Sequence, residues 1–155
     1  MALRAAQKLG FSDIKVQSNG LLYAQPSNVE RLLAAGCNRF HVSIHTHDPA
    51  AYDTLVQREG SYPLMAAGLD TLVARNVRLT VDVILKSDTY RKLGDALGWL
   101  RDRGVRSVHL WFVSLTDGNR DNVPSMPKMT EVVPVLREAF AFGRAHGVEV
   151  RSLHV

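Results

Sequence analysis

Short runs rich in β-branched and aromatic residues recur along the chain, and a segment with helical periodicity separates each run from the next. The candidate strands are residues 13–18, 39–45, 77–86, 106–114 and 148–153. Gaps of this length exclude hairpins and favour right-handed β-α-β crossovers, which build a parallel sheet. The sequence therefore predicts an α/β fold with a parallel sheet of about five strands.

Helix signals fill the gaps between these runs. Ser27 and Glu30 have the spacing of a capping box at the start of a helix that stops at Gly36. Thr130 is placed to cap a later helix that runs to His146. Two further gaps carry apolar residues at helical spacing. Strands and helices thus alternate from one end of the chain to the other.

Side chains alternate in polarity along the candidate strands, and this constrains the shape of the sheet. In the second strand, three apolar side chains (Phe40, Val42 and Ile44) alternate with three polar ones (His41, Ser43 and His45). A parallel sheet covered by helices on both sides is apolar throughout, and burying an unpaired polar group costs about 1–3 kcal/mol. We therefore predict a curved, partial (β/α) barrel with helices on its outer face and a polar concave side. We predict that residues 1–155 form one incomplete (β/α) barrel domain.

Sites in barrels of this kind lie at the carboxyl ends of the strands. The polar candidates there are Ser18, Asn19, Ser43, His45, Lys86, Trp111 and Ser114. Asp82 and His109 share the polar face with them and are expected to line the cavity. An irregular segment, residues 116–128, follows the fourth strand, and loops of this length often cover sites.

Composition narrows the classes of function. The formal net charge is +4, but the basic residues are scattered among acidic ones, which argues against nucleic-acid binding. No apolar run is long enough to cross a membrane, and the N-terminus lacks the apolar core of a secretory signal. Cys37 is the single cysteine, which excludes internal disulfides and is typical of a reducing compartment. We expect a cytoplasmic protein.

Several motifs together resemble the radical S-adenosylmethionine (SAM) enzymes, in particular their MoaA-, NifB- and PqqE-like branch. "VQSNG" after the first strand is similar to the family's Thr-Asn-Gly signature, with serine in place of threonine. "FHVSIHTHDPAAYDTLVQREGSY" resembles the family's next strand and helix, and "AGLDTLVARNV" resembles the helix that follows. The resemblance runs in the same order along essentially the whole chain.

The resemblance implies a partial barrel that binds SAM against the strand ends and uses it to generate a 5′-deoxyadenosyl radical. The resemblance places Ser18, Asn19 and Ser43 beside SAM and Asp82 and Lys86 on the cavity wall. From their places on the polar strand faces, we predict that Gln17 and His45 join the first group and His109 and Trp111 the second. The substrate is expected to be a small molecule or a peptide.

One departure from the family is decisive for activity. The family binds a [4Fe–4S] cluster through three cysteines in a C-x3-C-x2-C loop, and this sequence has no such loop. We therefore expect the chain to be the middle and later part of a longer enzyme, with the cluster ligands outside it. As given, it is expected to be inactive alone.

Two other classes of function stay open. His45 and His47 form an H-x-H pair that could bind a metal together with His109, as in metal-dependent barrel hydrolases. In those barrels the pair lies within the strand, whereas His47 is expected to lie beyond it, just before Pro49, so we favour a strand face that binds cofactor or substrate without a metal. Alternatively, the chain is a non-catalytic module for a ligand or partner. In any of these cases the open sheet edges predict self-association.

Overall fold

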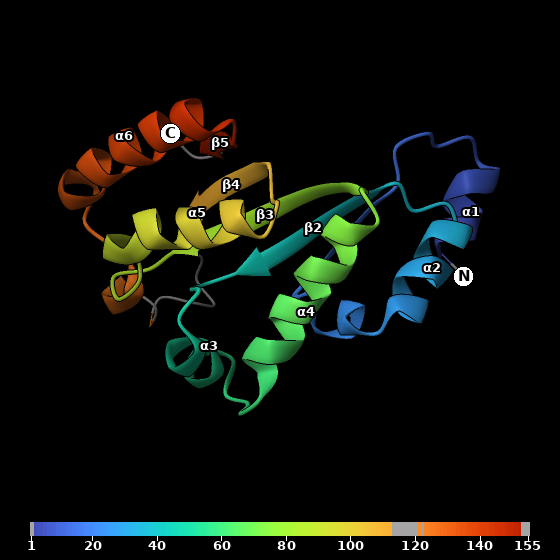
Figure 1. Cartoon of the computed structure of the whole chain (residues 1–155), viewed down its shortest axis with the longest axis horizontal. Coiled ribbons are helices and arrows are strands. Elements are labelled where there is room, and N and C mark those ends of the chain that lie inside the picture. Colours follow the sequence, from blue (N-terminus) through green and yellow to red (C-terminus); the bar gives the residue numbers. More distant parts are fainter. Residues whose placement is uncertain (1, 113–120, 122, 153–155) are drawn as a thin grey trace.

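The structure, a computed structural model, describes residues 2–112, 121 and 123–152. Five parallel strands form one sheet in chain order, as predicted (Figure 1). The strands are β1 (Lys15–Ser18), β2 (Arg39–Ile44), β3 (Arg78–Leu85), β4 (Ser107–Phe112) and β5 (Glu149–Ser152). β1 and β5 each pair with one strand in the described part of the chain. Both edges are therefore open there, and self-association through them stays a prediction.

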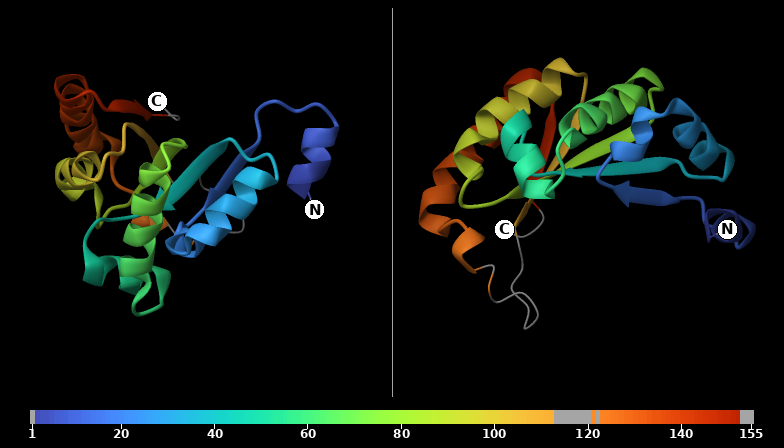
Figure 2. Two further views of the ribbon diagram at one scale, coloured as in Figure 1. Left: turned by 45° about the vertical axis from the view of Figure 1, so that its right-hand side comes forward. Right: turned by 90° about the horizontal axis from the view of Figure 1, so that it is seen from below.

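Helices connect every pair of neighbouring strands. They are η1 (Leu21–Ala24), α2 (Pro26–Ala34), α3 (Pro49–Val56), α4 (Ser61–Ala74), η2 (Tyr90–Lys92), α5 (Leu93–Asp102) and α6 (Met129–His146), and one further helix, α1 (Ala2–Lys8), precedes β1. The sheet is curved and unclosed, and α2, α4, α5 and α6 follow its convex side (Figure 2, right). This is the predicted partial-barrel architecture. No helix in the described part of the chain is both long and apolar enough to cross a membrane.

Two predicted helix caps are wrong. α2 begins at Pro26 and its N-cap is Gln25, so Ser27 lies inside the first turn and cannot form a capping box with Glu30. Proline suits this start because its fixed φ matches the helix and its missing N–H would be unpaired there in any case. α6 likewise begins one residue before Thr130, with Lys128 at the N-cap position and no side-chain cap.

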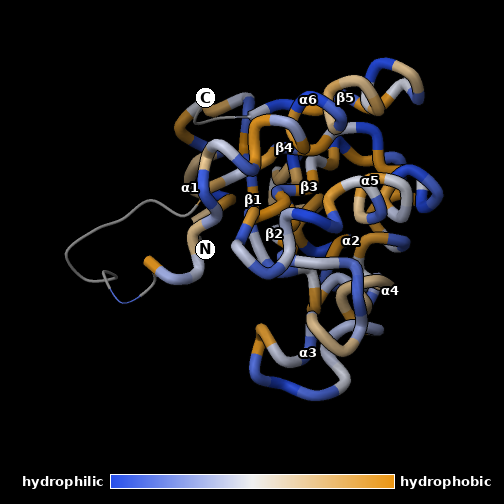
Figure 3. Tube along the Cα trace, turned by 90° about the vertical axis from the view of Figure 1, so that its left-hand side faces the viewer, coloured by the Kyte–Doolittle hydropathy of each residue, from blue (hydrophilic) through white to orange (hydrophobic). Residues whose placement is uncertain are grey.

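The hydrophobic core lies between the convex face of the sheet and the helices. Phe40, Val42 and Ile44 of β2 are fully buried there, as their alternation predicts. Leu69 and Leu72 of α4 belong to the same core. Hydrophobic segments gather in the middle of the molecule, where strands and helices meet (Figure 3). Because the core lies on the convex side, the side chains of the concave face are available to form a functional site.

Candidate functional site

A cavity of about 220 Å³ opens on the concave face, near the carboxyl ends of β1 to β4. Its lining consists of Gln17, Ser43, Asp82, Ile84, Trp111 and Phe112. Four of these residues are sequence candidates, and the structure brings them together. Ile84 and Phe112 were not among the candidates, so the wall is less polar than the strand pattern suggested.

Asp82 is the centre of this site. Its side chain is 1% exposed, and such a burial is costly for a carboxylate without partners. Gln17 Nε2 donates to Oδ2 at 3.2 Å, and Trp111 Nε1 donates to Oδ1 at 3.2 Å. His41 Nδ1 lies 3.1 Å from Oδ2. Side chains from β1, β2 and β4 thus converge on one carboxylate of β3.

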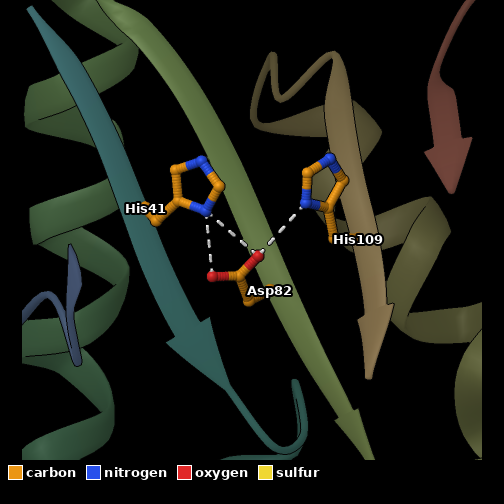
Figure 4. A group of neighbouring side chains, drawn as sticks. All are labelled: His41, Asp82 and His109. Atoms are coloured by element: carbon orange, nitrogen blue, oxygen red, sulfur yellow. Dashed lines mark hydrogen bonds and ion pairs between the residues drawn. The ribbon is translucent and has the colours of Figure 1, made fainter. Parts of the chain in front are cut away.

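Two histidines flank this carboxylate from the neighbouring strands (Figure 4). His41 belongs to β2 and His109 to β4, with His109 Nδ1 3.6 Å from Asp82 Oδ1. Burial lowers the pKa of His109, while the carboxylate of Asp82 opposes this shift. His41 was not among the predicted site residues. Its place on the same strand face as Ser43 was the signal that could have included it.

The predicted cofactor residues Ser18 and Asn19 hold a turn and do not line the cavity. Ser18 Oγ accepts a hydrogen bond from Gly20 N, and Asn19 Oδ1 accepts one from Leu21 N. Ser18 also pairs in register with Val42, whose side chain points into the convex core. Successive side chains of a strand point to opposite faces, so Gln17 points to the concave side and Ser18 does not.

α4 packs directly on this turn. Gly20 has φ +82°, which favours glycine, and a Cβ at Gly68 of α4 would lie 2.2 Å from the carbonyl oxygen of Gly20. The turn after β1 can therefore approach the helix this closely only because residue 68 is glycine, whereas Gly20 is favoured by its positive φ and by Val42 Cγ1, which would lie 2.9 Å from a Cβ there. This contact fixes the end of β1, and with it the position of Gln17.

His45 and Lys86 lie beyond the ends of β2 and β3 and are not among the residues that line the cavity. Burial lowers the pKa of His45, and the nearby positive charge of Lys86 lowers it further. Ser114 and residues 116–120 and 122 of the 116–128 segment lie outside the described residues. The described end of that segment contacts Ser87, whose N–H donates to Ser125 O at 2.8 Å.

The structure does not bring together His45, His47 and His109, the group considered as an alternative metal site. A different group could hold a metal ion. Within the described ranges, His41, Asp82 and His109 are the one group of three or more His, Cys, Asp or Glu residues whose potential ligand atoms all lie within 4.8 Å of one another. β2 ends at Ile44, so His45 and His47 belong to the turn before α3. His109 pairs with Asp82 of β3, and Asp82 pairs with Ser43 of β2. His109 is therefore level with Ser43, and His45 lies two residues further along the chain.

No protein-family model matches the chain, and no curated sequence matches it significantly. Solved structures do match. SuiB of Streptococcus suis bound to S-adenosylmethionine has a TM-score of 0.73 at 12% identity, over 97% of this chain and 35% of that one. HemN, the coproporphyrinogen III oxidase of Escherichia coli and a radical SAM enzyme, has a TM-score of 0.69 at 16% identity, over 94% and 36%. anSMEcpe with bound AdoMet and the Cp18Cys peptide has a TM-score of 0.64 at 12% identity, over 88% and 39%.

The fold is that of the radical SAM enzymes. The chain spans about a third of the length of SuiB and of HemN (35% and 36%). At these identities the likeness shows the fold alone, and membership of the superfamily and of its MoaA-, NifB- and PqqE-like branch stays a prediction.

Proposed function

We propose that this chain forms part of the barrel of a radical SAM enzyme and supplies a wall that binds SAM and substrate. The observation that carries the proposal is the cavity on the concave face, at the strand ends, lined by Gln17, Ser43, Asp82 and Trp111. Open α/β sheets bind their ligands at this end of the strands. The fold likeness to enzymes solved with bound SAM supports the same site.

The cavity residues fit the chemical groups of SAM. The Gln17 amide and the Ser43 hydroxyl can bind polar groups of the ligand, and the aromatic side chain of Trp111 offers apolar contact surface. At about 220 Å³ the cavity is smaller than typical ligand sites of roughly 300–1,000 Å³, so these residues form one wall of a larger site. Bound SAM would supply the 5′-deoxyadenosyl group that this class of enzyme uses to abstract hydrogen.

The residues of this chain do not fit an iron–sulfur cluster. Cys37 is the single thiol, and a cluster needs several thiolates. Cys37 precedes β2, whereas Ser43 lies near its carboxyl end, and six extended residues span roughly 20 Å. The thiol is also buried in the core, which raises its pKa. We propose that the cluster ligands come from outside this sequence, and that the substrate is a small molecule or a peptide.

Titration of the ¹⁵N-labelled chain with SAM, followed by amide chemical shifts, tests the proposal. Saturable shifts are expected at the carboxyl ends of β1 to β4, and Ser43→Ala should weaken the binding. Ser107→Ala is the matched control, because Ser107 begins β4 at the opposite end of the strands and contacts Thr80 and Glu149. Shifts spread evenly over the molecule, or equal binding by the two variants, would refute the site.

A further inference from the structure

The proposed binding of SAM does not explain why His41, Asp82 and His109 lie together. The three side chains come from adjacent strands and turn toward one another on the concave face (Figure 4). Their ligand atoms all lie within 4.8 Å of one another, although no two of these residues are close in sequence. His41 and Asp82 are 5% and 1% exposed. Their convergence is therefore a built feature of the fold.

The spacing of these atoms suits a tetrahedral metal ion. Zn²⁺ binds imidazole nitrogen and carboxylate oxygen at about 2.0–2.2 Å, which places neighbouring ligand atoms about 3.4 Å apart. His41 Nδ1 lies 3.1 Å from Asp82 Oδ2, and His109 Nδ1 lies 3.6 Å from Asp82 Oδ1. All the ligand atoms lie within 4.8 Å of one another, so a spacing of about 3.4 Å requires no pair to approach by more than about 1.4 Å.

Hydrogen bonding alone leaves this group incompletely satisfied. Among the residues that the structure describes, the buried His109 Nδ1 has no hydrogen-bond partner, because its 3.6 Å separation from Asp82 is too long for a hydrogen bond. An ion between them would give this nitrogen a partner. Gln17 and Trp111 donate to the same carboxylate, which is the arrangement that orients metal-binding carboxylates in known sites.

We propose that His41, Asp82 and His109 bind one divalent transition-metal ion, with Zn²⁺ as the preferred occupant. Two imidazoles and one carboxylate are a set of three ligands typical of zinc sites that keep a fourth position open. Asp82 also lines the cavity, so that position is available to water or to a bound molecule. The ion would act there as a Lewis acid beside the substrate. This proposal does not depend on SAM binding.

Cobalt titration of the whole chain, after dialysis against a chelator, tests this site. The expected result is one equivalent of Co²⁺ with the intense visible absorption of a tetrahedral ion, displaced by Zn²⁺. His41→Gln and His109→Gln should each weaken binding by at least about 100-fold, since even residues that only orient ligands contribute 10–100-fold. His146→Gln is the control, because His146 ends α6, is exposed and lies outside the group.

Circular dichroism confirms that each variant is folded before its titration is interpreted. Absence of stoichiometric Co²⁺ and Zn²⁺ binding by the unaltered chain would overturn the proposal without reference to any variant. Binding retained in folded His109→Gln would overturn it as well. An NMR spectrum with Nδ1–H protons on both histidines in the presence of Zn²⁺ would do the same, because a protonated nitrogen cannot bind a metal.

Discussion

Gly68→Ala should destabilise the chain, although alanine is the better helix former. The added Cβ would lie 2.2 Å from the carbonyl oxygen of Gly20 and 3.3 Å from Tyr23 Cβ. The helix and the turn must separate by about 0.8 Å to reach 3.0 Å, a distance below which real Cβ atoms essentially never come. Overpacking of this kind costs about 1–3 kcal/mol, and contact with rigid backbone favours the upper end. The gain in helix propensity is about 0.8–1.0 kcal/mol, so a net loss of about 2 kcal/mol remains.

Gly98→Ala is the matched control for this prediction. Gly98 lies inside α5, and a Cβ there would meet nothing within 4 Å. This variant should gain about 0.8–1.0 kcal/mol from helix propensity alone. For a chain of this size the melting temperature should fall by about 4–8 °C in Gly68→Ala and rise by about 2–4 °C in Gly98→Ala. Urea unfolding with unchanged m values measures both free energies. A Gly68→Ala variant as stable as the unaltered chain would refute the close packing of α4 on the turn after β1.

Three further predictions concern other parts of the molecule. Asp53→Ala should lower the free energy of unfolding in urea by about 1–2 kcal/mol, because the carboxylate accepts two 2.7 Å hydrogen bonds from backbone amides at the start of α4. Asp53→Asn keeps one acceptor and should lower it by less. The pKa of His45 lies below its ordinary value of 6.5, so the unfolded chain binds a proton at higher pH than the folded one does. Stability should therefore fall as the pH drops below 6.5 towards the folded-state pKa. Lys86→Met should raise the pKa of His45 in an NMR titration, because it removes a nearby positive charge. A His45 pKa at or above 6.5 in the unaltered chain would contradict this prediction. Phe40→Ala should lower the free energy of unfolding by about 3–5 kcal/mol, because Phe40 is fully buried. Leu22 is 73% exposed, so Leu22→Ala should change it by no more than about 0.5 kcal/mol. Equal losses in the two variants would contradict the core assignment.

The sequence was sufficient to predict the strands and their apolar face, because alternation is a local property. Phe40, Val42 and Ile44 must share a face wherever β2 lies, and helices between the strands leave parallel pairing as the simple solution. The same reasoning placed Ser43 and Asp82 together on the opposite face. These predictions needed no knowledge of which residues far apart in sequence come into contact.

The composition of the site could not be predicted in the same way, because it depends on register and on where each strand ends. His41 joins Asp82 because β2 and β3 pair with Ser43 opposite Asp82, and no local pattern specifies that offset. His45 is excluded because β2 ends one residue earlier, at Ile44. Strand ends are set by the turns that follow them, and here the turn leads to Asp48, whose side chain caps α3.

The buried carboxylate of Asp82 explains how a face without covering helices can still have a defined shape. Side chains from β1, β2 and β4 turn inward to meet it: Gln17 and Trp111 donate hydrogen bonds, and His41 Nδ1 lies 3.1 Å away. Each of the three loses side-chain freedom in this arrangement. Gln17 and Trp111 are thereby held in fixed orientations, and both line the cavity. The shape of the cavity therefore depends on a hydrogen-bonded centre, whereas the stability of the fold depends mainly on the apolar core on the other face. A substitution of Asp82 should consequently alter ligand binding in variants that still fold, which separates the chemistry of the concave face from the packing behind it.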